Sequence, residues 1–415
     1  SRGLGDVYKR QGEQNALVSD IGGTTTDVCL LYAGRPKIDP QGARVGPYRT
    51  MVEAVAMRTT GLGGDSEVHV VDGVNSGLWL GPRRLMPISL AAQNYPELVH
   101  KTLDQCLSND APLVDAGQFA IPMFTVLPQG LDAREQTVAT RLLNGPMPVS
   151  QAAITRIEKP ALMRLVTRGM LMIAGVTPSD ASHVLGRVDV WDKDAATKAL
   201  ALFGRRRTGS GNFLATGPKA MAQMVVDQLT KQTVNCLLQT AFDEDGWMQP
   251  ELLAAHPLTM AGLNQHRGVV QIGLKLGVPV IGLGASAAAY YGAVGERLNT
   301  RIILPKHAGV ANAIGAIVGQ VAMHASGVVT SQGAGNFIVH LPEGINQFLT
   351  SDEAMAMLEE ALTIAAGNSA RAAGVEEIRF AVARDIKQVN IEGQMMFIEA
   401  SVKVTAQGRP RIAAD

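Results

Sequence analysis

Residues 16–31 read ALVSDIGGTTTDVCLL, and this stretch decides the fold. An apolar run leads to Asp20, a polar segment of two glycines and three threonines follows, and a second apolar run begins after Asp27. The pattern predicts a strand, a tight turn and a second strand. Glycines allow a backbone to approach an anion closely, and amides and hydroxyls donate to phosphate oxygens. A phosphate-binding turn is therefore favoured over an ordinary polar hairpin.

The proposed phosphate contacts in this turn are Gly22, Gly23, Thr24 and Thr25. The two glycines would bring backbone amides close to the anion, and Thr24, Thr25 and Thr26 would add hydroxyl donors. The spacing Asp-x-Gly-Gly-Thr-x-x-Asp-Val between two strands is much more specific than a lone pair of glycines.

A second glycine-rich turn lies at 60–68, TGLGGDSEV, and leads into an apolar stretch. Gly63 and Gly64 are expected to offer backbone amides to a phosphate. Asp65 is expected either to hold a metal-bound water or to cap the following segment. The spacing alone favours the functional and the structural role of this turn equally.

Composition limits the classes of function. The chain has 415 residues, 46% of them apolar and 18% charged, which predicts a globular protein of two or three domains. The formal charge is zero, so neither nucleic acid nor an anionic membrane is an expected partner. The three arginines at 205–207 are read as a solvated turn. Three scattered cysteines without metal-ligand spacing predict buried thiols and a reduced, cytoplasmic compartment.

The central part of the chain is expected to be largely helical. Residues 82–146 are mixed and show no recognisable chemistry. Thr177 is the predicted N-cap of a helix, with Pro178 at its first position and Asp180 in its first turn. Apolar spacing predicts another helix within 216–238. A DNA-reading pair of helices is disfavoured because the second helix is not basic.

Alternating strands and helices are predicted again from residue 268. A buried strand beginning at 278 runs into Gly282 and Gly284, and a helix follows at 287–298. A strand, a glycine turn and a helix in this order can pack a nucleotide against the backbone. After a strand at 301–305, a second small-residue helix is expected at 309–321. Residues 308–342 contain no Asp, Glu, Lys or Arg, but their polar residues favour a buried interdomain helix over a membrane span.

The end of the chain is predicted to be an α+β module. Ser351 is the expected cap of an amphipathic helix closed by Gly374, and alternating strands follow. Such a module usually packs against another domain or dimerises.

Four motifs together carry a family resemblance. DIGGTTTDV at 20–28, GLGGDSEV at 61–68, TPSDASHVLGR at 177–187 and the glycine-rich segment 281–316 resemble the A subunits of the hydantoinase and 5-oxoprolinase family. That family belongs to the actin-like ATPase superfamily. The resemblance implies an α/β fold: a ribonuclease H-like, actin-like ATPase subdomain with an inserted helical region and a carboxyl-terminal α+β module.

The resemblance also suggests how the chain is divided. Its successive parts would be a non-native leader, the phosphate-loop part of the ATPase subdomain, an inserted mixed and helical region, the nucleotide-side part of the subdomain and the α+β module. The corresponding ranges are 1–11, 12–81, 82–267, 268–335 and 336–415.

Residue roles follow by matching position. Asp20 resembles the acidic residue of the second phosphate loop, which orders Mg²⁺ or its water, and the segment 22–25 resembles the turn that holds the terminal phosphates of ATP. Gly63, Gly64 and Asp65 resemble the adjoining glycine turn. Gly282 and Gly284 resemble the glycines on the adenosine side. Asp20 and Asp65 are the expected catalytic residues, and Asp20 is the expected metal ligand.

The implied activity is ATP-dependent hydrolysis of a small cyclic amide such as a hydantoin or 5-oxoproline. Phosphorylation of the amide oxygen would make the carbon open to attack by water. A B-type hydantoinase subunit or a second copy of the chain is the expected partner. An acetone-carboxylase-like subunit and a small-molecule kinase of the same superfamily are the alternatives.

One feature of the family pattern is missing from the sequence. The superfamily pairs two ribonuclease H-like halves, and the first phosphate loop would lie upstream of the second. We therefore expect an amino-terminally truncated chain, or a half supplied by another chain. Alone, the polypeptide is expected to bind ATP weakly and to turn over nothing.

Overall fold

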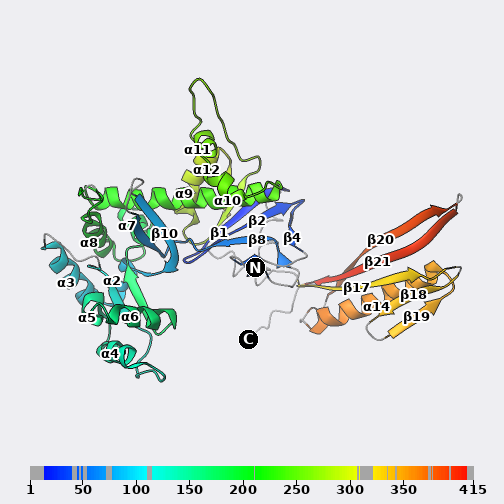
Figure 1. Cartoon of the computed structure of the whole chain (residues 1–415), viewed down its shortest axis with the longest axis horizontal. Coiled ribbons are helices and arrows are strands. Elements are labelled where there is room, and N and C mark those ends of the chain that lie inside the picture. The colour runs from blue at the N-terminus through cyan, green and yellow to red at the C-terminus, as the bar shows by residue number, and fades with distance from the viewer. Residues whose placement is uncertain are drawn as a thin grey trace. The chain divides into compact units, whose positions relative to one another are not determined.

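The computed structural model of the chain has two compact units (Figure 1). The larger unit lies within residues 14–310 and the smaller within 311–415. The residues described are 14–39, 44–45, 48–49, 54–71, 77–109, 115–209, 211–305, 308, 321–333, 335–341, 344–372, 375, 377–391 and 394–408.

A mixed sheet forms the centre of the larger unit. Its core strand β1 (Ala16–Ile21) is buried at every residue, as its apolar sequence predicts. β1 pairs antiparallel with β2 (Thr26–Tyr32) and parallel with β15 (Val280–Leu283). The predicted strand, turn and strand are therefore confirmed. The remaining strands of the sheet are β3 (Arg35–Pro36), β5 (Arg44–Val45), β6 (Tyr48–Arg49), β8 (Met57–Thr60) and β16 (Ile302–Ile303).

Two short antiparallel pairs accompany this sheet. β9 (Ser66–Val71) pairs with β10 (Gly77–Arg84), and β4 (Ile38–Asp39) pairs with β7 (Ala54–Val55). β9 begins directly after the second glycine turn, so the β9–β10 pair continues from a segment that lies beside the β1–β2 turn.

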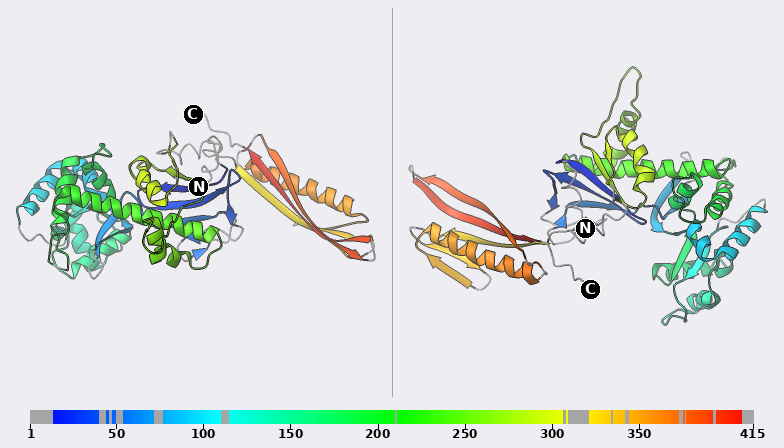
Figure 2. Two further views of the ribbon diagram at one scale, coloured as in Figure 1. Left: turned by 90° about the horizontal axis from the view of Figure 1, so that it is seen from above. Right: turned by 180° about the vertical axis from the view of Figure 1, so that it is seen from behind.

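The longest described helix, α9 (Pro218–Glu244), connects the parts of the larger unit (Figures 1 and 2). It packs against β2, β10 and α12 (Ala287–Leu298). It also packs against the helices α7 (Pro178–Val184), α8 (Lys193–Gly204) and α10 (Pro250–Ala255). Its buried residues lie on several sides, because neighbours surround it. The helix predicted within 216–238 is confirmed, and in the structure it continues to Glu244. α10 (Pro250–Ala255) and α11 (Pro257–Leu263) follow it.

A four-stranded sheet with surrounding helices forms a second part of the larger unit, between residues 86 and 204. Its strand order is β11-β14-β12-β13, and part of it covers a separate hydrophobic core built from apolar residues between 85 and 173. The strands are β11 (Met86–Pro87), β12 (Phe119–Pro122), β13 (Met147–Pro148) and β14 (Leu171–Gly175). The helices are α2 (Ile88–Asn94), α3 (Pro96–Leu107), α4 (Ala133–Arg141), η1 (Leu142–Asn144), α5 (Val149–Ala152), α6 (Glu158–Thr167), α7 (Pro178–Val184) and α8 (Lys193–Gly204).

The smaller unit is an antiparallel sheet with one long helix on it (Figure 2). The strand order is β19-β18-β17-β21-β20, and α14 packs mainly on β17 and β21. Apolar residues at alternate positions of β21 face the helix, as period-two patterning predicts. The elements are β17 (Val321–Ser331), β18 (Phe337–Leu341), β19 (Gly344–Phe348), α14 (Ser351–Ala372), β20 (Arg379–Ile391) and β21 (Gln394–Gly408).

The mixed α/β class is confirmed, and so are several local predictions. α7 begins after Thr177, which accepts a hydrogen bond from Asp180 N in a capping box, and α12 spans 287–298. The ribonuclease H-like and actin-like assignment stays a prediction. The α+β unit includes β17 and so begins before residue 336.

Two local predictions were wrong. Ser351 is the first residue of α14, and the cap is Thr350, whose hydroxyl accepts from Glu353 N at 3.3 Å. The arginines at 205–207 are not simply a solvated turn, because Arg206 stacks over the Phe203 ring at 3.9 Å and Arg205 donates to Leu107 O at 2.6 Å.

Two further expectations concern residues 308–342 and the end of α14. The helix expected at 309–321 falls almost wholly outside the described residues, and so does Gly374. The buried helix expected within 308–342 was wrong over the later part of this segment, because β17 and β18 pair there as antiparallel strands. Among the described helices, none is long and apolar enough to cross a membrane.

Candidate functional site

The β1–β2 turn exposes several hydrogen-bond donors. Gly22 N donates to Thr25 O at 2.8 Å, which closes the turn. No hydrogen bond within the described residues uses the N–H groups of Gly23 and Thr24 or the hydroxyls of Thr24 and Thr25. Gly22, Gly23 and Thr24 are exposed and Thr25 is half-buried. Thr26 differs from the expectation, because it is buried and its hydroxyl donates to Leu62 O at 2.7 Å. The turn therefore presents open donors of the kind that bind phosphate oxygens.

The second glycine turn packs directly against the first. Gly64 N donates to Gly22 O at 3.0 Å, and Asp65 N donates to Gly23 O at 2.8 Å. A Cβ on Gly63 would lie 2.5 Å from Gly22 O, so only glycine allows this approach. The family resemblance implies that both turns belong to one subdomain, and in the structure the two turns are in contact.

The amides of Gly63 and Gly64 have a different role from the expected one. Gly63 N donates to Ser66 Oγ at 2.8 Å, and Gly64 N is used by Gly22 O. Both groups therefore donate within the protein rather than to a ligand. The second turn holds the carbonyl side of the first turn in place, and this leaves the open donors on the first turn alone.

The Asp65 carboxylate lies beside Gly23 of the β1–β2 turn and has two hydrogen-bonding partners. Its Oδ2 accepts from Arg84 Nη2 at 3.2 Å, and its Oδ1 accepts from Ser179 Oγ at 3.2 Å. Burial raises the pKa of this carboxyl above its ordinary value, and the Arg84 guanidinium and the Ser179 hydroxyl lower it by less. The group is thus a partly desolvated carboxylate beside one cation.

Neither partner of Asp65 was predicted from the sequence. Ser179 stands in the first turn of α7, and its N–H and hydroxyl both donate to Gly64 O, at 2.8 and 2.9 Å. The only signal in the sequence was its place in the helix start at 177–180. Arg84 ends β10, and no pattern in the sequence marked it.

The start of α7 is held by a buried carboxylate. Asp180 accepts from the N–H groups of Thr177, Ile88 and Ser89 and from the hydroxyls of Thr177 and Ser89, at 2.7–3.1 Å. Burial raises the pKa of Asp180, and these hydrogen bonds oppose the rise. One side chain therefore joins the amino-terminal ends of α2 and α7, and Ser179 is positioned next to it.

The glycines after β15 approach β1 from its other side. Gly284 has φ +111°, and a Cβ on it would lie 2.1 Å from Ile21 O and 3.4 Å from Asp20 Oδ1. The buried Asp20 carboxylate thus lies next to Gly284, at the end of β1 that leads into the β1–β2 turn. Gly282 is buried against the Tyr291 ring, since a Cβ there would lie 2.7 Å from that ring. Gly282 therefore permits close packing of α12 on β15.

Two tyrosines of α12 fix the strand and the helix behind the site. Tyr291 Oη bonds to Ser19 O at 2.9 Å and to Ser19 Oγ at 2.8 Å, below β1. Tyr290 Oη lies 2.7 Å from Ser182 Oγ of α7. Burial raises the pKa of Tyr290 to about 12 and also raises that of Tyr291. Both phenols therefore stay protonated and act as structural hydrogen-bonding groups.

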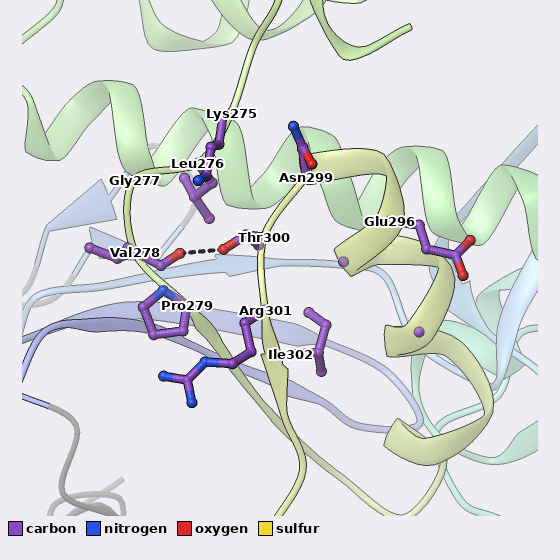
Figure 3. Close-up of a pocket in the computed structure, with 12 residues that line it drawn as sticks. Lys275, Leu276, Gly277, Val278, Pro279, Glu296, Asn299, Thr300, Arg301 and Ile302 are labelled. Carbon is purple, nitrogen blue, oxygen red and sulfur yellow. Dashed lines mark hydrogen bonds between the residues drawn. The ribbon is translucent and has the colours of Figure 1, made fainter. Parts of the chain in front are cut away.

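A separate cavity of about 580 Å³ lies at the opposite end of β15 (Figure 3). It is lined by the segment before the strand and by the carboxyl-terminal end of α12, and Thr300 Oγ1 donates to Val278 O at 2.8 Å within it. Gly284, which approaches Ile21 beside the β1–β2 turn, follows the other end of β15. This cavity is therefore separate from the β1–β2 turn.

A resident metal cluster is not seen among the described residues: no three His, Cys, Asp or Glu side chains there are grouped to hold an ion. Mg²⁺ bound with a nucleotide needs fewer protein ligands, because phosphates and water complete its shell. Two buried carboxylates, Asp20 and Asp65, beside open phosphate donors fit that requirement.

One family model matches the part of the chain that contains both glycine turns. Residues 2–96 match the family model described as hydantoinase/oxoprolinase, so the resemblance to this family is confirmed over the segment that contains both glycine turns. No curated protein matches the chain.

Two solved structures are similar to the chain as a whole. A nucleotide-free acetone carboxylase shares 14% identity with a TM-score of 0.48, and an ATP-dependent caprolactamase from Pseudomonas jessenii shares 13% with a TM-score of 0.44. Each match covers 99% of this chain and 48% of the other. The chain thus spans about half the length of these proteins.

Proposed function

We propose that the β1–β2 turn binds the terminal phosphates of ATP in an ATP-dependent enzyme of the hydantoinase/oxoprolinase type. The observation that carries the proposal is the set of open donors on Gly23, Thr24 and Thr25, held in place by the second glycine turn. The match of residues 2–96 to the family supports it. Fixed donors aimed at phosphate oxygens are what phosphoryl transfer mainly requires from a protein.

The carboxylates would organise the cation of the nucleotide. Asp20 is the proposed ligand of Mg²⁺ or of its water, because it is buried at the end of β1 beside the turn. Asp65 would position the turn and orient water through its contacts with Arg84 and Ser179. When bound, Mg²⁺ would neutralise developing negative charge on the phosphates.

The proposed reaction is ATP-dependent opening of a small cyclic amide. Phosphorylation of the amide oxygen would weaken the carbon–nitrogen bond and allow water to attack the carbonyl carbon. The whole reaction would use a partner, either a B-type hydantoinase subunit or a second copy of the chain. An acetone-carboxylase-like activity and a small-molecule kinase remain the second candidates within the same proposal of ATP chemistry.

ATP binding is tested first with the purified chain. Titration calorimetry with ATP and Mg²⁺ is expected to show binding that Thr24→Val and Thr25→Val weaken and that Thr24→Ser retains. The valines remove only hydroxyls, and Thr24 is exposed, so folding should not change. Equal binding by the wild type and both valine variants would contradict the assignment of the turn.

The reaction class is tested in the reconstituted assembly with its partner subunit. A ring-opened acid together with one phosphate for each turnover supports the amide hydrolase. A stable phosphorylated product would favour the kinase, and a carboxylated product that requires bicarbonate would favour the carboxylase. Each outcome selects one of the three reactions.

A further inference from the structure

A second cavity in the larger unit lies away from the phosphate turn. Its volume is about 740 Å³, within the range of small-molecule sites. It is lined by residues of the β9–β10 pair, the middle of α9, the short helices α10 and α11 and the last turn of α12. None of the residues that the structure describes in the β1–β2 turn or the second glycine turn lines this cavity.

Two buried polar atoms of the cavity lining have no hydrogen-bond partner among the described residues. They are Asn235 Oδ1 on α9 and Arg297 Nε on α12. Both atoms are covered, although their residues line the cavity. Buried polar atoms are normally bonded, so two unbonded ones behind a cavity wall point to a ligand or water that reaches them after a small rotation of the side chains. Gln232 in the same wall shows the usual state, because its amide both donates to Leu80 O and accepts from Leu80 N, at 3.0 and 2.9 Å.

The charge of the cavity is positive. Lys231 and Arg297 line it, and among the residues that the structure describes no aspartate or glutamate does. Within the described part of the chain, neither cation takes part in an ion pair. An anion entering the cavity would therefore meet two cations and no opposing carboxylate from the described part of its wall.

The remaining wall is apolar. Leu78, Leu238 and Leu263 are buried, and Trp79 is half exposed. Such a wall favours an organic body over inorganic phosphate or a bare ion, because burying apolar surface is favourable.

We propose that this cavity binds a small organic carboxylate that has an apolar body and an N–H or O–H donor. The carboxylate pairs with Lys231 and Arg297, the donor bonds to Asn235 Oδ1, and the apolar body lies against the leucines and Trp79. This site is independent of ATP binding at the β1–β2 turn.

The cavity in Figure 3 is a weaker candidate for such a ligand. Its wall contains Glu296 as well as Lys275 and Arg301, so its charge is mixed. No buried polar atom without a partner lies in its wall among the described residues.

Three matched compounds test the proposed chemistry by titration calorimetry on the whole chain without ATP. N-acetyl-leucine has the carboxylate, the donor and the apolar body. N-acetyl-leucinamide lacks the charge, and 4-methylpentanoate lacks the N–H donor. N-acetyl-leucine is expected to bind most tightly, with the neutral amide weakened about tenfold or more, the loss expected for one charged hydrogen bond of about 1.4 kcal/mol.

Variants locate the binding. Lys231→Gln and Asn235→Asp are expected to weaken N-acetyl-leucine, the first by removing a cation and the second by adding a repelling carboxylate. Lys219→Gln is the matched control, because Lys219 is exposed on the same helix and does not line the cavity. Lys231 is also exposed, so its variant should keep the wild-type circular dichroism and melting temperature.

The proposal is overturned if none of the three compounds binds at millimolar concentration, or if the acid and its amide bind equally. It is also overturned if Lys219→Gln weakens binding as much as Lys231→Gln. Because no nucleotide is present, none of these results bears on the ATP proposal.

Discussion

Gly23 and Asp65 lie so close that a Cβ on Gly23 would approach Asp65 Oδ2 to 2.6 Å. The carboxylate thus fills the space that a side chain at position 23 would take, directly beneath the open donors of the turn. Gly22, one residue earlier, differs: a Cβ there would only meet Thr25 O at 3.4 Å, an ordinary contact.

This pair of glycines gives a matched test of the turn. Gly23→Ala is expected to displace Asp65 and to destabilise the larger unit by about 1–3 kcal/mol, as overpacking does. Gly22→Ala should be nearly neutral in stability. Urea unfolding of both variants measures the difference, and similar losses for the two would show that the contact with Asp65 is not what requires glycine.

Tyr291→Phe is expected to destabilise the chain by about 1–2 kcal/mol, because buried Ser19 O and Ser19 Oγ both lose a partner. Ser19→Ala removes one of the two contacts. The double variant should lose less than the sum of the single losses, since the residues share one interaction. Urea denaturation of the four proteins completes the cycle, and strict additivity would contradict the coupling.

Asp65 makes stability depend on pH with a defined sign. Its pKa is raised in the folded chain, so the native state binds this proton more tightly than the unfolded state. As pH rises from about 3.9, the ordinary value for aspartate, through the raised value, the native state loses stability relative to the unfolded state.

The variant Asp65→Asn isolates this effect. The free energy of unfolding of the wild type minus that of the variant is expected to fall across that pH window. Asp227→Asn, at an exposed position on α9, controls for the loss of one negative charge. A difference that rises with pH would reverse the sign and contradict the argument.

The three thiols should react at different rates in the native chain. Burial raises the pKa of Cys29 to about 12 and also raises that of Cys236, so little thiolate forms at either. Cys106 is half-buried. An aromatic disulfide reagent at pH 8 is expected to modify Cys106 first and all three thiols only after denaturation. Fast modification of Cys29 would contradict its burial.

The isolated chain should bind ATP with Mg²⁺ weakly and hydrolyse none. The physical reason is that it presents one set of phosphate donors, whereas phosphoryl transfer requires charge stabilisation on several sides. Release of phosphate from ATP by the purified chain measures this. Sustained turnover that is lost in Asp20→Asn would refute the expectation.

The sequence predicted the local elements well where one pattern dominates. The apolar runs around Asp20 identified β1 and β2, and the Thr177–Pro178 start identified α7. Contacts between distant segments were less visible. Asp65 was singled out by its glycines, but nothing near it in the sequence indicates Arg84 or Ser179, because these meet it only through the tertiary fold.

The role of the second glycine turn was the main difference between prediction and structure. The sequence shows that Gly63 and Gly64 allow a close approach, but it does not show which group approaches. In the structure the approaching group is the backbone of the first turn. Close packing of protein on protein and of protein on phosphate select the same residue type, so only the fold distinguishes them.

The hydrogen bonds around the phosphate turn also set the order in which it can be completed during synthesis. Ser179 reaches back 115 residues to Gly64, and Tyr291 reaches back 272 residues to Ser19. Contacts this distant in sequence form only after the intervening chain has been closed into a loop. On a translating ribosome, the turn between β1 and β2 therefore gains its full set of supporting contacts only after α12 has emerged.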